Sequence, residues 1–306
     1  MDKIFYTKNL KTWFRATRPF VFPASIVPIL VGGAFAFYTN RWEANWWLFP
    51  LIFIAGVLYH AATNLVSDYY DYAKGVDREG TYGGSRVLIE KIMHPKEMLY
   101  GGYILFAIGT LIGFFLVAKV GYPLLIIGLI GLFGGILYTA KPLNYKYHGF
   151  GDFLVFLLMG PLMVLGTFYT LTESMNWYVL LISIPIGLLI ASILNANNIR
   201  DINYDKQAHI KTFTAVIGYK ASKYEYIFLV SGAYILVLVF IGLRILEPYS
   251  LLVLLVLPQA YKNMREISAA QINNPQQIAM MDVSSAQLHM KFGLLLSVGI
   301  ILSAIF

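Results

Sequence analysis

Apolar runs long enough to cross a membrane recur along the whole 306-residue chain. The hydrocarbon layer of a bilayer is about 30 Å thick, so a spanning helix needs roughly 17 to 25 mostly apolar residues. Hydrophobic residues make up 58% of the chain and charged residues only 13%, which is more apolar than a soluble domain requires. Because the runs continue far beyond the first segment, a cleavable signal peptide does not explain them. The sequence therefore predicts an all-α, multi-pass integral membrane protein.

We expect nine spanning helices in one domain that covers residues 1–306. The eighth span is short and begins at Pro248. The chain has no cysteine, which excludes disulfides, thiolate metal sites and cysteine nucleophiles. The expected spans lie near residues 20–38, 46–66, 98–118, 122–139, 150–172, 177–197, 225–243, 248–261 and 289–306.

The basic residues predict the orientation of these spans. Of the 23 Lys and Arg residues, only Arg41, Lys119 and Arg244 fall on the side opposite to the N-terminus. By the positive-inside rule the N-terminal side is cytoplasmic, which in a bacterium places the protein in the inner or plasma membrane. The opposite connections are short and nearly uncharged, so we expect chemistry on the cytoplasmic side. Scattered basic residues agree with contact to membrane lipid and argue against nucleic acid as a partner.

Carboxylates gather where two long cytoplasmic loops are expected to begin, at residues 67–97 and 198–224. The first cluster lies within NLVSDYYDYAKGVD and the second within NANNIRDINYD, and their similar spacing indicates an internal duplication. Helical positions three, four, seven or eight residues apart share one face. Each segment therefore presents an amide and two carboxylates together, and two equivalent segments indicate one shared site. The residues are Asn64, Asp68 and Asp71 in the first segment and Asn197, Asp201 and Asp205 in the second.

These residue types favour magnesium chemistry. Mg²⁺ prefers oxygen ligands and usually combines one or two protein carboxylates with substrate phosphates. The simpler alternative is that each cluster forms ordinary salt bridges with basic residues of its own loop. Paired carboxylates near a membrane are costly without compensation, so two facing clusters favour Mg²⁺ and a diphosphate whose hydrocarbon tail lies among the spans. The basic residues available to contact the diphosphate are Arg86, Lys141, Arg200 and Lys211.

Several stretches between residues 18 and 218 form a recognisable pattern. They are RPFVFPASIVPILVG, NLVSDYYDYAKGVD, GGSRVL, YTAKPLNYKYHGFGDFLVFLLMGPLMVLGTFY and NNIRDINYDKQAHIKT. The pattern resembles the UbiA superfamily of membrane prenyltransferases, most closely the branch that prenylates 1,4-dihydroxy-2-naphthoate on the way to menaquinone. Ser67 stands where many members have Asn, and His209 and Ile210 replace a common glycine and basic residue.

The resemblance implies nine transmembrane helices around a central cavity, with a cytoplasmic cap made by the two long loops. It implies Mg²⁺-dependent transfer of a polyprenyl group from polyprenyl diphosphate to 1,4-dihydroxy-2-naphthoate, with loss of carbon dioxide and demethylmenaquinone as the product. The implied metal ligands are Asp68, Asp71, Asp77, Asp201 and Asp205. Of these, the implied catalytic carboxylates are Asp68, Asp71, Asp201 and Asp205. The implied substrate contacts are Asn64, Arg86, Tyr138, Asn197, Asn198, Arg200 and Lys211.

Two alternatives stay open at this stage. The first keeps the fold but changes the acceptor to 4-hydroxybenzoate, a glyceryl phosphate lipid or a tetrapyrrole; the segments GGSRVL and KGVD resemble the naphthoate branch more closely. The second is a cation-coupled transporter, because carboxylates in two repeated halves also serve ion pathways. Transporter sites lie near the bilayer midplane, whereas these carboxylates are expected at cytoplasmic helix ends, which favours the enzyme.

Overall fold

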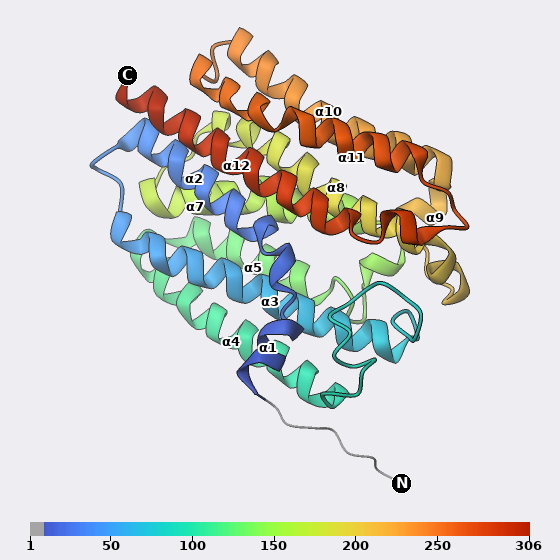
Figure 1. Ribbon diagram of the computed structural model, residues 1–306. Helices are drawn as coiled ribbons and strands as arrows, with labels where there is room; N and C mark the ends of the chain where they lie inside the picture. Colours follow the sequence, from blue (N-terminus) through green and yellow to red (C-terminus); the bar gives the residue numbers. More distant parts are fainter. Residues whose placement is uncertain (1–8) are drawn as a thin grey trace.

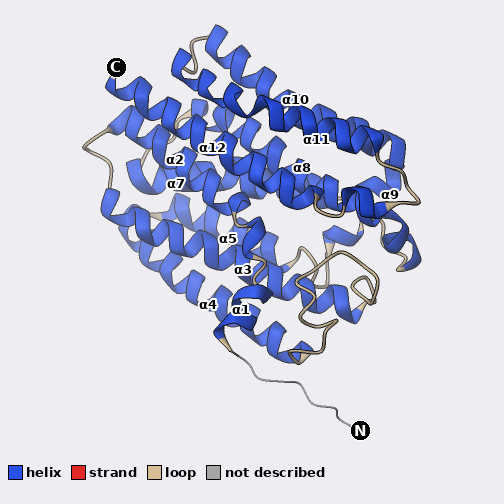
Figure 2. Ribbon diagram, in the orientation of Figure 1, coloured by secondary structure: helices blue, strands red, loops and turns tan. Residues whose placement is uncertain are grey.

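The computed structural model describes residues 9–306, so residues 1–8 of the expected domain lie outside the described part. Within residues 9–306 the chain forms helices and loops and no strand, and the only ladder contact is an isolated bridge between His148 and Lys211 (Figure 2). The α-helices are α1 (Leu10–Ala16), α2 (Pro23–Asn40), α3 (Phe49–Ala73), α4 (Pro95–Val120), α5 (Tyr122–Ile136), α6 (Gly151–Leu157), α7 (Met163–Thr172), α8 (Trp177–Gln207), α9 (Phe213–Ile217), α10 (Tyr219–Gly242), α11 (Leu257–Ala269) and α12 (Met281–Ile305).

Shorter helical turns connect or extend these helices. A π-helical turn, η4 (Leu158–Leu162), joins α6 to α7 into one apolar span. It contains Pro161, which has no N–H for the regular hydrogen bond and so favours a local change of helical geometry. The 3₁₀ helices are η1 (Pro19–Val21), η2 (Trp46–Leu48), η3 (Tyr145–Tyr147), η5 (Pro248–Val256) and η6 (Pro275–Ile278).

Seven helical segments of the described chain are long and apolar enough to cross a membrane. They confirm the multi-pass, all-helical prediction. Of the nine expected spans, the fourth is the shorter apolar helix α5, and the eighth is the 3₁₀ helix η5 followed by α11. Pro248 begins η5, and Pro258 occupies the first turn of α11, where a missing N–H costs no helical hydrogen bond.

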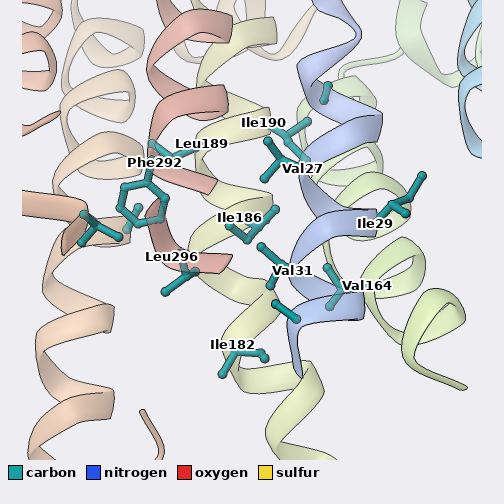
Figure 3. Packing of buried hydrophobic residues seen from close by; sticks show 14 of the residues in the cluster. Val27, Ile29, Val31, Val164, Ile182, Ile186, Leu189, Ile190, Phe292 and Leu296 are labelled. Atoms are coloured by element: carbon teal, nitrogen blue, oxygen red, sulfur yellow. The ribbon is translucent and has the colours of Figure 1, made fainter. Parts of the chain in front are cut away.

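Apolar side chains of α2, α7, α8 and α12 form the main core of the bundle (Figure 3). Glycine allows the closest approaches, as is common between membrane helices. A Cβ atom on Gly293 of α12 would lie 2.1 Å from the side chain of Val27, and one on Gly32 would lie 2.7 Å from the carbonyl oxygen of Val164. The helices therefore pack with their backbones close together on this side, away from α4 and α5.

Helices α3 and α8 continue through both aspartate clusters, so the carboxylates lie on the last helical turns rather than in loops. The prediction that the loops begin at residues 67 and 198 is therefore wrong by several residues. Helix α3 ends only before Gly75, which has a φ of +72°, and α8 ends before His209, which has a φ of +57°. These left-handed residues terminate the helices. The segment after α3 and helix α9 lie at the same end of the bundle (Figure 1).

Candidate active site

A cavity of about 400 Å³ lies in the bundle and ends beside the aspartate clusters. Its walls are mostly apolar side chains of α3, α4, α5, α7 and α8, while its polar end includes Asn64 and Tyr82. A smaller pocket of about 30 Å³ adjoins this end and is lined by carboxylates from both clusters. Arg18, Lys146 and Asn197 line both spaces. The site therefore joins a small, charged compartment to a long apolar one.

Buried donors surround the carboxylates of the first cluster. Asp68 is 3% exposed and accepts hydrogen bonds from the Arg18 guanidinium and from the backbone N–H (3.0 Å) and hydroxyl of Ser85. Asp71 is 2% exposed. It accepts from Lys146 Nζ at 2.6 Å, the Tyr147 hydroxyl at 2.9 Å and the Ser67 hydroxyl at 3.1 Å. Ser67 thus contacts a motif carboxylate directly.

Nearby donors compensate only part of the negative charge of the second cluster. Arg200 Nε and Nη2 donate to the two carboxylate oxygens of Asp201 at 3.0 and 2.8 Å, and Arg200 also pairs with Asp282 at 2.9 Å. Asp205, one helical turn later, is 5% exposed, and no described residue forms a hydrogen bond or ion pair with its carboxylate. A buried carboxylate without a partner is unfavourable unless a ligand compensates its charge.

Asp77 brings a fifth carboxylate to the pocket from the segment after α3. Its Oδ2 lies 4.0 Å from Arg18 Nη2, too far for a direct hydrogen bond. Burial and the nearby carboxylate of Asp71 raise the pKa of Asp77 to about 6. Cβ atoms on Gly83 and Gly84 would lie 2.8 and 2.4 Å from the Asp77 carboxylate oxygens. The glycines of GGSRVL therefore let the backbone approach this carboxylate closely.

Lys146 is the cation that pairs with Asp71 of the first cluster. Burial alone would lower its pKa, but the Asp71 carboxylate outweighs burial and raises the pKa of Lys146 above its ordinary value. The ammonium group therefore stays charged between Asp71 and the aromatic rings of Tyr138 and Tyr147, whose centroids are both 5.8 Å away. It supplies a fixed positive charge where the two compartments meet.

The donor set fits a hard divalent cation. The aspartates offer only oxygen ligands, as Mg²⁺ prefers, and no cation of residues 9–306 donates a direct hydrogen bond to the carboxylate of Asp205 or Asp77. As the side chains stand, no three His, Asp or Glu side chains of residues 9–306 are close enough to enclose a metal ion. Arg18 and Lys146 instead hold Asp68 and Asp71. Metal binding would require these cations to give up part of their contact with the carboxylates.

Other predicted contacts fall into two groups. Tyr138 and Asn64 line the large cavity, Asn197 lines both spaces, and Asn198 lines the small pocket while donating to Asp152 at 3.1 Å. Arg200 lines neither space and instead anchors Asp201 to α12. Three predicted cations are exposed and outside both linings: Arg86, Lys141 and Lys211.

Sequence reasoning missed two cations that the structure brings into the site. Arg18 precedes α2 in RPFVFP, and its φ of +56° turns the chain toward Asp68. Lys146 lies in the 3₁₀ turn η3, five residues after the predicted Lys141. The available signal was the placement of Lys146 between two tyrosines, since an aromatic-flanked lysine in an apolar chain indicates a buried cation.

Comparison with known proteins identifies the arrangement. The model of the UbiA prenyltransferase family matches residues 25–285. The chain is 32% identical to a 1,4-dihydroxy-2-naphthoate octaprenyltransferase of Bacillus subtilis, over 95% of this chain and 92% of that protein. It is 33% identical to a UbiA prenyltransferase domain-containing protein 1 homolog of Drosophila melanogaster, over 94% of this chain and 78% of that protein. A UbiA homolog from Archaeoglobus fulgidus bound to DMAPP and Mg²⁺ has the same fold, with a TM-score of 0.62 and 17% sequence identity. The match covers 94% of this chain and 99% of that one.

Proposed function

The chain belongs to the UbiA prenyltransferase family, and we propose that it transfers a polyprenyl group from polyprenyl diphosphate to 1,4-dihydroxy-2-naphthoate. The ring carboxylate leaves as carbon dioxide and the product is demethylmenaquinone. The choice of acceptor is supported by the name of the Bacillus subtilis relative and by the segments KGVD and GGSRVL. It is a membrane-embedded enzyme of the prenyltransferase class.

One observation carries the proposal: carboxylates of two separate helix ends meet at the polar end of a long apolar cavity. The proposed metal ligands are Asp68, Asp71, Asp77, Asp201 and Asp205, which would hold Mg²⁺. Bound Mg²⁺ would stabilise the negative charge that develops on the leaving diphosphate, a contribution of several kcal/mol. A soluble diphosphate would not need the apolar compartment, and an apolar ligand would not need the carboxylates.

The chain's own cations are proposed to bind the diphosphate oxygens. Nε of Arg18 is buried and has no hydrogen-bond partner among residues 9–306, so Arg18 can donate to a substrate oxygen while it stays beside Asp68. Lys146 lies beside the same space and remains charged. Asn64 and Asn197 add neutral donors at the polar end. The apolar walls keep water from the reacting allylic carbon, so an aromatic ring carbon attacks it instead.

We also propose that the bundle counts nine spans, with α5 and the η5–α11 segment completing the seven long ones. The segment after α3 and the segment containing α9 would then cap the cytoplasmic end. The excess of Lys and Arg at that end supports this orientation. The segment after α3 contacts the last turn of α8, which leads into the segment containing α9: the rings of Tyr82 and Tyr204 lie 6.4 Å apart, and Arg78 donates to Gln207 at 2.5 Å. Val76 and Ile210, one from each segment, belong to one buried cluster, which supports a shared cap.

Turnover with matched acceptors tests the proposal. Purified protein is incubated with Mg²⁺ and farnesyl diphosphate, with 1,4-dihydroxy-2-naphthoate or 4-hydroxybenzoate offered in parallel. We expect a prenylated, decarboxylated naphthoquinol and release of carbon dioxide. Product from 4-hydroxybenzoate alone would overturn the acceptor, and ion flux through the protein in sealed vesicles without any product would overturn the enzymatic proposal.

A further inference from the structure

Three glycines of the large cavity have no neighbour where a side chain would be. A Cβ atom on Gly113 of α4, or on Gly128 or Gly131 of α5, would meet no atom of residues 9–306 within 4 Å. All three line the cavity. Glycine is the poorest helix-forming residue after proline, and in membrane helices it is usually retained where another helix packs closely. Since no side chain of the described residues packs on these three glycines, the space that they leave open is their distinguishing property.

Glycines nearer to the polar end behave differently. A Cβ atom on Gly135 would lie 2.8 Å from the Thr63 hydroxyl oxygen, and one on Gly109 would lie 2.7 Å from the Tyr59 ring. These positions pack helices together. The cavity wall of α4 and α5 therefore changes, with increasing distance from the carboxylates, from packed glycines to open ones.

The open glycines lie at different depths. Helix α5 leads from the far end of the cavity to Tyr138 and Lys146 at the polar end. At 1.5 Å per residue, Gly131 is roughly 10 Å and Gly128 roughly 15 Å along the chain from Tyr138. The difference between them is comparable to the length of one isoprene unit. A chain that runs from the polar end along α5 would pass Gly131 first and Gly128 next.

A residue with an unpartnered hydroxyl lies in the wall of the same part of the cavity. Thr167 of α7 is 2% exposed and lines the cavity, and its Oγ1 has no hydrogen-bond partner among residues 9–306. It lies level with the middle of α5, because a Cβ atom on the adjacent Gly166 would lie 3.1 Å from Ile127. A buried donor without a partner is unfavourable.

We propose that Gly131, Gly128 and Gly113 set the length of prenyl tail that the enzyme accepts, because each keeps a stretch of the tail path open. This inference rests on the proposed prenyl transfer. A leucine at Gly131 blocks the path closest to the carboxylates and excludes all but short tails. A leucine at Gly128 blocks it further along and admits a tail about one unit longer.

Turnover with donors of different length tests the inference. Gly131→Leu and Gly128→Leu are compared with wild type on geranyl, geranylgeranyl and octaprenyl diphosphate, with Mg²⁺ and 1,4-dihydroxy-2-naphthoate. The matched control is Gly242→Leu at the end of α10. A Cβ atom there also meets no atom of the described chain within 4 Å, but Gly242 does not line the cavity. We expect kcat/KM for the longest donor to fall at least about tenfold relative to geranyl diphosphate in both cavity variants, and not in the control.

The outcomes are distinguishable. Turnover of geranyl diphosphate at the wild-type level shows that the cavity variants fold. Turnover of geranylgeranyl diphosphate that is lost in Gly131→Leu but kept in Gly128→Leu supports a tail path that the two positions block at different depths. An unchanged ratio of long to short donors in both variants, with an active wild type, overturns the inference and leaves the proposed function standing. A wild type that turns over no donor of any length overturns both.

Discussion

Replacing Lys146 by methionine tests how the site balances its charges. The substitution keeps most of the side-chain volume but leaves the Asp71 carboxylate, 2% exposed, without the cation 2.6 Å away. Removing one partner of a buried ion pair costs about 3–5 kcal/mol. Because the hydroxyls of Tyr147 and Ser67 still donate to Asp71, we expect the free energy of unfolding to fall by about 3 kcal/mol.

The same substitution removes a charge from the proposed diphosphate site, and we expect kcat to fall by roughly 10² to 10³. Unfolding is followed in detergent by tryptophan fluorescence, and turnover by product mass. Adding Asp71→Asn to Lys146→Met should restore much of the stability, because the unpaired charge is gone, without restoring turnover. Lys141→Met is the matched control: that lysine is exposed and outside both cavity linings. Equal effects of Lys146→Met and Lys141→Met would refute the charge balance described for the site.

Three further predictions concern single positions. Asp205→Asn should raise the stability of the metal-free protein, because no residue of the described chain pairs with the buried Asp205 carboxylate. It should also lower Mg²⁺-dependent turnover at least about 100-fold, and calorimetry with and without Mg²⁺ checks the stability. The pKa of Asp77 in the folded protein is about 6, above the ordinary value of about 3.9. Its contribution to metal-free stability is therefore present at low pH and is lost as pH rises through 6. Asp77→Asn should flatten the profile of unfolding free energy against pH between about pH 4 and pH 7. His209→Gly should raise the free energy of unfolding by roughly 1 kcal/mol, because glycine adopts the left-handed conformation without strain; a lower melting temperature would contradict this.

The sequence was sufficient to predict the multi-pass helical fold and the two aspartate clusters. Both rest on local patterns, namely apolar runs of spanning length and an amide with two carboxylates on one helical face. The cavity linings include Asn64, Asp71, Asn197 and Asp201. Their roles as ligands or contacts stay predictions until metal or substrate binding is measured.

The remaining features depend on tertiary placement. Arg18 reaches Asp68 from fifty positions earlier in the chain through one left-handed residue, and Lys146 reaches Asp71 through a 3₁₀ turn. The two flanking tyrosines are the local feature that distinguishes Lys146 from the exposed Lys141, and they do not indicate that Lys146 pairs with Asp71. The predicted starts of the two long loops were wrong because charged, tyrosine-rich segments at a membrane surface are typical of loops. In the structure these segments are the last turns of α3 and α8.

Binding of Mn²⁺ in place of Mg²⁺, measured by electron paramagnetic resonance with a non-hydrolysable prenyl thiodiphosphate, tests the shared two-cluster site most directly. We expect wild type to bind Mn²⁺ tightly only with the thiodiphosphate present, and we expect Asp71→Asn and Asp201→Asn each to abolish this binding while the protein stays folded. Mn²⁺ binding that survives both substitutions would contradict a site shared by the two aspartate clusters.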